Sequence, residues 1–123
     1  MDNLASDDGL GGIDTLSDIE QIRGSDFGDY LEGSDRDTFA IDGYFEAFEG
    51  RKGDDTIDGR GGGDVAQYGT ARKGVHVDLL NSVATQDGYG GVDTLANIEG
   101  AHGSSFDDTL IGSNDSALLD GRA

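Results

Sequence analysis

Two consecutive nine-residue units, at residues 50–58 and 59–67, constrain the fold of this chain more than any other feature. They read GRKGDDTID and GRGGGDVAQ, so both carry glycine at the first and fourth positions and aspartate at the sixth. Glycine accepts backbone conformations with positive φ, which tight turns require. The residues that follow each aspartate suffice for a strand of about three residues. The spacing therefore predicts short strands that alternate with glycine-rich turns.

Other short apolar pieces, such as 75–79 and 109–111, are bounded by Gly, Asp, Asn or Ser and predict further strands. The segments DTLSDIE at 14–20 and DTLANIE at 93–99 fit either a strand or a single helical turn. Segments this brief cannot bury an apolar face alone, so they must stack on equivalent segments. The pattern predicts an all-β, parallel solenoid.

An internal repeat organises the whole chain. The 27 residues from Asp8 align with the 27 residues from Asp87, an offset of 79, and 16 of the 27 positions are identical. The chain therefore reads as one solenoid segment of about one and a half units cut from a longer array. It has nonapeptide-like repeats near 24–67, a spacer near 68–102 and a partial repeat at 103–123. Phe27 and Phe106 recur at the same offset and are expected in the core.

The composition limits the partners. The 123 residues include 22 Gly, no Pro and no Cys, and 26 acidic against 8 basic residues give a net charge of −18. Such a charge repels nucleic acid and anionic lipid, and a cationic partner would relieve it. Without thiolates, oxygen atoms are the abundant metal ligands, which favours calcium. No apolar run approaches the ~18 residues of a membrane span.

The nonapeptides resemble the G-G-x-G-x-D-x-U-x repeat of RTX, or hemolysin-type, calcium-binding proteins, with Arg51 and Arg60 in place of the second glycine. The resemblance implies a right-handed parallel β-roll or β-helix in which calcium lies between loops two repeats apart. Residues 68–102 are similar, less specifically, to the spacers of long secreted RTX proteins. Secretion by bacteria through a type I channel is then expected, with a signal outside this chain.

Pairing every second loop places the expected calcium ligands. Residues 33–37 should lie beside residues 50–55, and the loop around Glu46 should lie beside residues 59–64. Asp108 should face a loop that begins at Gly121. Asp55→Ala is expected to cost more calcium-dependent stability than Asp64→Ala. The predicted ligands are Asp29, Asp35, Asp37, Glu46, Gly50, Lys52, Asp55, Gly59, Gly61, Asp64 and Asp108, with carbonyl oxygens from the glycines and from Lys52.

Other functions are weaker hypotheses. An EF-hand opening at Asp54 would carry Val65 at its twelfth position instead of a glutamate. No phosphate-binding loop motif or ordered Ser, His and Asp set is present, and His76 and His102 lack a partner at metal spacing, so we expect no enzymatic activity. The aromatic residues Phe39, Tyr44, Phe45 and Phe48 fit either a hydrophobic plug that replaces a missing metal or a patch that binds polysaccharide or protein.

The sequence thus predicts a calcium-binding structural module that folds when calcium binds after export. The alternatives are an adhesin that uses its aromatic loop and the non-catalytic tail of a secreted enzyme. An exposed terminal coil is a sheet edge, so association of copies end to end is also expected.

Overall fold

The computed structural model describes residues 2–5, 14–17, 21–34, 45–114 and 118–122, all of them in strands, turns or loops. The expectation of an all-β fold of short strands is confirmed for these residues. None of them belongs to a helix long and apolar enough to cross a membrane. The strands are β1 (Asp2–Ala5), β2 (Asp14–Ser17), β3 (Gln21–Arg23), β4 (Tyr30–Glu32), β5 (Phe45–Glu49), β6 (Thr56–Asp58), β7 (Gly63–Gln67), β8 (His76–Asp78), β9 (Val83–Gln86), β10 (Asp93–Ala96), β11 (Gly100–His102), β12 (Thr109–Ile111) and β13 (Leu118–Asp120).

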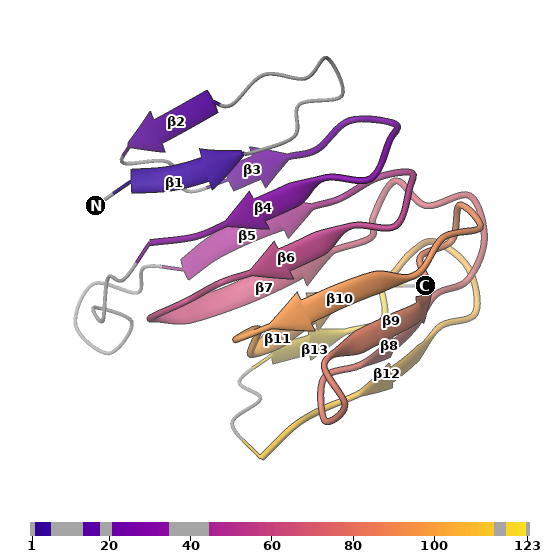
Figure 1. Ribbon diagram of the computed structural model, residues 1–123. Helices are drawn as coiled ribbons and strands as arrows, with labels where there is room; N and C mark the ends of the chain where they lie inside the picture. Colours follow the sequence, from indigo (N-terminus) through magenta and orange to yellow (C-terminus); the bar gives the residue numbers. More distant parts are fainter. Residues whose placement is uncertain (1, 6–13, 18–20, 35–44, 115–117, 123) are drawn as a thin grey trace.

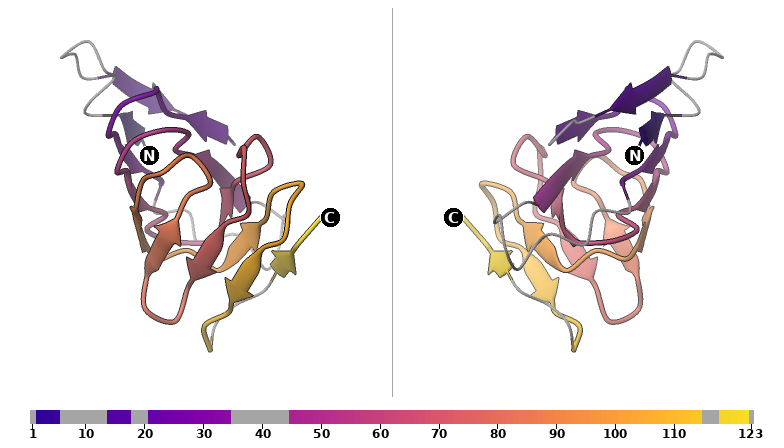
Figure 2. Two further views of the ribbon diagram at one scale, coloured as in Figure 1. Left: turned by 90° about the vertical axis from the view of Figure 1, so that its right-hand side faces the viewer. Right: turned by 90° about the vertical axis from the view of Figure 1, so that its left-hand side faces the viewer.

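The strands form two sheets, which Figure 1 shows as two layers and Figure 2 shows from two further sides. The five-stranded sheet has the order β13-β11-β7-β5-β3, and all of its pairs are parallel. The eight-stranded sheet has the order β12-β8-β9-β10-β6-β4-β1-β2. From β3 to β7 the chain crosses from one sheet to the other after every strand. Each strand therefore pairs with the strand two places along the chain.

The larger sheet is mixed, which the prediction of a wholly parallel solenoid did not anticipate. Strands β8, β9 and β10 run as an antiparallel meander, and β10 then returns to pair with β6 in parallel. The physical reason is the length of the spacer. It is too long for one coil, so its extra backbone donors and acceptors are satisfied by two additional strands within the same sheet.

Three strands in the first copy of the sequence repeat have counterparts in the second copy. Strands β2, β3 and β4 have bounds 79 residues before those of β10, β11 and β12. The antiparallel pairing of Leu4 with Thr15 recurs as Val83 with Thr94. The segments DTLS and DTLA are therefore strands, which settles the choice between strand and helical turn.

The core lies between the two sheets. In each of the three-residue strands β4, β6 and β8 the central side chain points inward, and Leu31, Ile57 and Val77 are at most 2% exposed. Phe48 from β5 is fully buried. The expectation that Phe27 and Phe106 are core residues is wrong, because their side chains are 65% and 48% exposed. Both lie at the tips of turns and not on strands, so they point away from the stacked layers.

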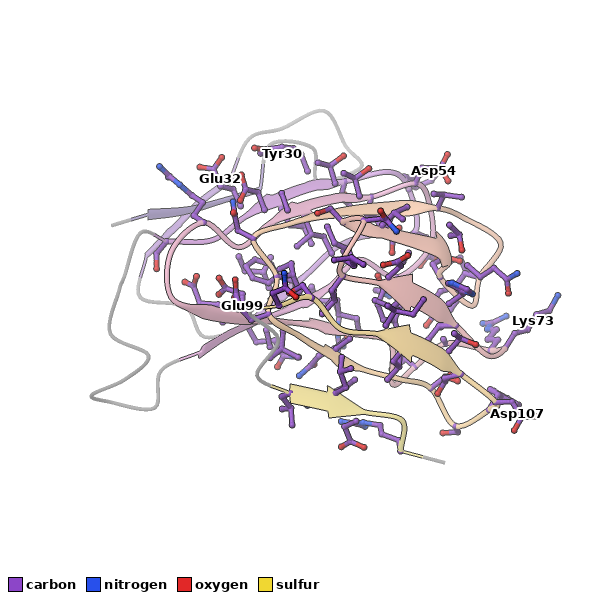
Figure 3. All side chains as sticks on the ribbon, turned by 90° about the horizontal axis from the view of Figure 1, so that it is seen from below. Tyr30, Glu32, Asp54, Lys73, Glu99 and Asp107 are labelled. Carbon is purple, nitrogen blue, oxygen red and sulfur yellow. The ribbon has the colours of Figure 1, made fainter. Side chains whose placement is uncertain are left out.

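The crossings between the sheets, together with the turn from β9 to β10, gather at two ends of the molecule. We call the end formed by residues 24–29, 50–55, 68–75, 87–92 and 103–108 the first loop end. The second loop end is formed by the described residues of the β4–β5 connection and by residues 59–62, 97–99 and 112–114. In Figure 3 the labelled Asp54, Lys73 and Asp107 lie at one end, and Glu32 and Glu99 lie toward the other.

Candidate metal centre

Four of the predicted aspartates, Asp29, Asp55, Asp64 and Asp108, each fold back onto the glycine five residues before them. A Cβ built on Gly50 would lie 2.2 Å from Oδ2 of Asp55, and one built on Gly59 would lie 2.4 Å from Oδ2 of Asp64. The carboxylate thus occupies the space that a side chain would need. This contact explains, in physical terms, why glycine stands at the first position of both nonapeptides.

Two loops satisfy their aspartate with a serine, and we call residues 24–29 and 103–108 the serine loops. In the first, the amide of Ser25 donates to Oδ2 of Asp29 at 2.6 Å, and the hydroxyl donates to Oδ1 at 3.1 Å. In the second, the amide of Ser104 donates to Oδ2 of Asp108 at 2.8 Å, and the hydroxyl donates to Oδ1 at 2.7 Å. These carboxylates have protein donors on both oxygens.

The other two loops carry arginine where the serine stands, and we call residues 50–55 and 59–64 the arginine loops. Arg51 and Arg60 have φ values of 75° and 65°, the left-handed conformation that glycine adopts most easily. Asp55 and Asp64 are each 1% exposed. Oδ2 of Asp55 and both carboxylate oxygens of Asp64 are buried without a hydrogen-bond partner. An unsatisfied buried oxygen of this kind costs about 1–3 kcal/mol, and more when it carries charge.

The two arginines do not neutralise these carboxylates. The guanidinium of Arg51 lies 3.1 Å from Asp26, and that of Arg60 lies 3.1 Å from Glu32, at the surface of the molecule. The amide of Arg60 donates to Oδ1 of Asp58 at 3.0 Å. The guanidinium groups of both arginine loops are therefore paired with carboxylates other than the buried Asp55 and Asp64.

Burial changes the acidity of the buried aspartates. Burial, together with the negative charges of the nearby Glu46 and Glu99, raises the pKa of Asp64 to about 8. Burial also raises the pKa of Asp55 to about 6 and that of Asp93 to about 7. These carboxyl groups therefore ionise at higher pH than ordinary aspartates, unless a cation compensates for the lost hydration.

Carboxylates stack in a column at the first loop end. The amide of Asp29 donates to Oδ1 of Asp55 at 2.9 Å, and the amide of Asp55 donates to Oδ1 of Asp93 at 3.1 Å. The buried hydroxyl of Tyr68 donates to Oδ2 of Asp93 at 3.0 Å. In this column a backbone amide of one loop thus binds the carboxylate of the residue stacked next to it. Oδ2 of Asp55 is the carboxylate oxygen of the column that has no partner.

At the second loop end, carboxylate and carbonyl oxygens lie close to the Cα atoms of Gly33 and Gly59. A Cβ on Gly59 would lie 2.4 Å from both Oδ2 of Asp64 and the carbonyl oxygen of Asn97. A Cβ on Gly33 would lie 2.6 Å from Oε2 of Glu46 and 2.5 Å from the carbonyl oxygen of Gly59. Two acceptors that converge in this way repel each other. The repulsion is relieved when a cation binds both or a proton lies between them.

The structure corrects one predicted loop pairing. Residues 50–55 lie beside residues 24–29, since Gly24 donates to Glu49 O at 2.8 Å and Thr56 donates to Asp29 O at 2.8 Å. Asp55 therefore faces Asp29, and the predicted neighbours Asp35 and Asp37 lie outside the described residues.

The reason lies at the start of the 33–37 segment. Gly33 donates to Asp58 O at 2.7 Å, and Gly61 donates to Ser34 O at 3.2 Å, so this segment begins at the second loop end beside residues 59–61. The sequence-based pairing counted residues 33–37 and the loop around Glu46 as two separate loops, whereas β5 is the next strand after β4 and pairs with β3.

The remaining predicted ligands differ in whether the structure places them beside their expected neighbours. Glu46 is the direct register partner of Asp64, as predicted. The carbonyl oxygen of Gly121 lies 3.2 Å from the Cβ position of Gly103, which Oδ2 of Asp108 approaches at 2.3 Å, so that pairing is also found. The carbonyl oxygens of Gly50 and Gly59 face Asp29 and Glu46 instead of the aspartates of their own loops. The side chain of Lys52 pairs with Asp26 at 3.0 Å.

Sequence reasoning missed several buried carboxylates. Asp87 and Asp93 are 0% exposed, and Glu49 is 4% exposed. A signal for the two aspartates was present, because both are identical to their counterparts Asp8 and Asp14 in the internal repeat. The aromatic cluster is divided: Phe48 is a core residue, whereas Phe39 and Tyr44 lie outside the described residues.

In the part of the chain that the structure describes, no group of three or more Asp, Glu, His or Cys side chains converges closely enough to hold a metal ion. Any ion at the arginine loops must therefore take backbone carbonyl oxygens and water as a large share of its ligands. Calcium sites commonly use such ligands.

No protein-family model, curated protein or solved structure matches this chain.

Proposed function

We propose that this chain is a calcium-binding structural module in which the arginine loops hold the ions. The observation that carries the proposal is the contrast between the two kinds of loop. Asp29 and Asp108 receive hydrogen bonds from serines, whereas Asp55 and Asp64 are buried at equivalent positions with unpartnered oxygens. A buried carboxylate without a donor is stable only when it is paired with a cation or protonated.

Calcium suits these loops better than other common cations. The ligands on offer are carboxylate and backbone carbonyl oxygens in irregular loops, and the chain has no cysteine. Magnesium demands a nearly ideal octahedron and keeps its water, whereas calcium accepts six to eight oxygens in flexible geometry. Asp64 with the carbonyl oxygen of Asn97 would hold one ion, and Asp55 would contribute to another.

We further propose that calcium couples to folding. Each ion would place two positive charges where carboxylates of adjacent coils converge, and its binding free energy would then become folding free energy. The net charge of −18 supports this mechanism, because repulsion opposes the compact state in the absence of ions. By its resemblance to RTX repeats, the chain would be a right-handed parallel β-roll segment of a large secreted bacterial protein, interrupted by the meander of β8 to β10.

The proposal predicts how much calcium is lost when one site is removed. Asp64→Asn should bind one calcium ion fewer than the wild type, measured by native mass spectrometry at increasing CaCl2. It should also lose more calcium-dependent stability than Asp55→Asn, the reverse of the sequence-based order. The reason is that Asp64 has two unpartnered oxygens and Asp55 has one.

Asp108→Asn is the matched control for this experiment. It changes the equivalent aspartate of a serine loop, whose oxygens already have donors, and should bind as many ions as the wild type. A wild type that binds no calcium would refute the proposal. Equal loss of ions from the Asp64 and Asp108 variants would refute the distinction between the loops.

The apolar edge formed by β12 and β13 favours association of copies end to end. Ile111, Leu118 and Leu119 are between 37% and 45% exposed on these strands. In the internal repeat β12 corresponds to β4, whose edge is covered by the parallel strand β6. We propose that a second copy of the chain covers the exposed edges of β12 and β13 in the same way.

Replacing Leu118 and Leu119 together by lysine should shift the protein toward monomer by at least tenfold in the dissociation constant. Charged residues on an edge strand oppose strand addition. Sedimentation velocity over a range of concentrations measures this shift. A double lysine substitution at the exposed Thr85 and Thr94, away from this edge, serves as the control. A wild type that is monomeric at all concentrations would contradict the proposal.

A further inference from the structure

The loop between β9 and β10 holds a buried aspartate that belongs to no nonapeptide. Oδ1 of Asp87 accepts the amides of Tyr89 at 2.7 Å, Gly90 at 2.9 Å and Gly91 at 2.8 Å. Gly88 and Gly90 have positive φ, which lets the backbone wrap around this oxygen. The carboxylate is thus fixed in orientation by its own loop.

The other oxygen of Asp87 has no such partners. The residue is 0% exposed, and its Oδ2 is buried without a hydrogen bond. Oδ2 lies 2.7 Å from the point that a Cβ on Gly91 would occupy, and the carbonyl oxygen of Gly53 lies 2.2 Å from the same point. Two hydrogen-bond acceptors, one of them a carboxylate oxygen, therefore converge in a space that only glycine leaves open.

The surroundings add negative charge. Asp55 and Asp93, both at most 1% exposed, lie close enough to Asp87 to interact with it electrostatically. The ion pairs formed by described residues involve other carboxylates, namely Asp26, Glu32 and Glu49. No cationic side chain of the described part therefore bonds to Oδ2 of Asp87.

A surface cavity of about 240 Å³ lies beside the loop that holds Asp87. It is lined by Gly88, Gly90 and Gly91, together with Lys73, Gly74 and Val92. Asp87 itself is buried. A metal site that exchanges its ion requires an entry path, so an ion that enters from this cavity would have to pass the glycine-rich loop.

We propose that Asp87 and the carbonyl oxygen of Gly53 form a further calcium site, which ties the spacer to the first arginine loop. Asp87 lies outside the nonapeptide pattern, and the site does not require that Asp64 bind an ion. Its ligand set, a carboxylate and a backbone carbonyl with room for water, suits calcium for the same reasons as above. Through Gly53 the ion would fix the meander of β8 to β10 against the stacked coils.

Asp87→Asn tests this site, because asparagine keeps the Oδ1 acceptor for the three amides and replaces the unpartnered oxygen by an amide donor. The variant should bind one calcium ion fewer than the wild type in native mass spectrometry. In EDTA it should unfold at a temperature no lower than that of the wild type, since an unpartnered charged oxygen has been removed. Asp107→Asn, a change of an exposed carboxylate, should match the wild type in both measurements.

Gly91→Ala is an independent variant, since its Cβ would clash with both the carbonyl oxygen of Gly53 and Oδ2 of Asp87. It should also lose one ion, whereas Gly121→Ala, where a Cβ meets nothing within 4 Å, should lose none. The site is refuted if Asp87→Asn binds as many ions as the wild type. It is also refuted if that variant melts at a lower temperature than the wild type in EDTA, which would mean that the carboxylate stabilises the fold without an ion. Loss of an ion from Asp64→Asn together with full binding by Asp87→Asn would refute this site alone, and a wild type without any bound calcium would refute both proposals.

Discussion

Removing calcium from the wild type with EDTA at pH 7.5 is expected to lower its melting temperature by about 20 °C. At a calcium concentration 100 times the dissociation constant, each bound ion adds about 2.7 kcal/mol of stability. Two ions at the arginine loops would add roughly twice that, and about 4 °C accompanies each kcal/mol in a domain of this size. Circular dichroism with EDTA and then with ~5 mM calcium, followed through thermal unfolding, measures the difference.

Magnesium at the same concentration is the control for this experiment, because it screens the charge of −18 as calcium does but suits irregular oxygen ligands poorly. We expect it to restore only a minor part of the lost stability. Identical β spectra and identical melting temperatures in EDTA and in calcium would contradict ion-coupled folding.

In EDTA the stability of the fold is expected to decline as the pH rises from about 4 to about 8. The pKa of Asp55 is raised to about 6, that of Asp93 to about 7 and that of Asp64 to about 8, whereas aspartates in an unfolded chain titrate near 4. Between these limits the folded state binds more protons than the unfolded state, so stability falls with increasing pH. Below about pH 4 the groups are protonated in both states, and this loss is absent.

Asp64→Asn isolates the largest part of the effect. In EDTA at pH 8 the variant should melt several degrees above the wild type, because it removes a buried carboxylate that loses its proton last. At pH 4 and below the two proteins should melt within about 2 °C of each other, because Asp64 is then largely protonated in both the folded and the unfolded state. Thermal unfolding across the pH range, with Asp107→Asn as a surface control, checks this. If the Asp64 and Asp107 variants follow the same curve, the buried aspartate is not the source of the pH dependence.

Calcium should flatten the same pH profile. An ion at Asp64 favours the ionised carboxylate, so the wild type with saturating calcium should keep its melting temperature between pH 6 and 8. The difference between the calcium and EDTA curves should therefore be largest at the alkaline end. A constant difference across this range would argue against binding at the buried aspartates.

The sequence by itself determined the local elements of this protein. The spacing of glycine and aspartate in residues 50–67 predicted strands at β6 and β7, and the apolar triplet at 109–111 predicted β12. These elements follow from turn geometry and alternating burial, which act over a few residues. The same spacing located Asp55 and Asp64, because an aspartate five residues after a glycine folds back over it.

Only the tertiary structure decided which loops meet. Asp55 faces Asp29 because β5 pairs with β3, which brings together residues 26 positions apart in the sequence. Local sequence signals act over a few residues, so they do not specify which distant strands pair. The insertion of β8 to β10 into one sheet has the same origin: the spacer could have stacked as separate coils, but its strands pair with one another and with β6.

The serine and arginine loops show what the sequence and the tertiary structure each contribute. Their residues can be read from the sequence, but the meaning of the difference appears only when the donors are located. Ser25 and Ser104 supply the hydrogen bonds that Asp55 and Asp64 lack, while Arg51 and Arg60 turn toward surface carboxylates. The sequence therefore determined where carboxylates would be buried. The three-dimensional arrangement decided which of them lack a donor, because that depends on atoms from neighbouring coils.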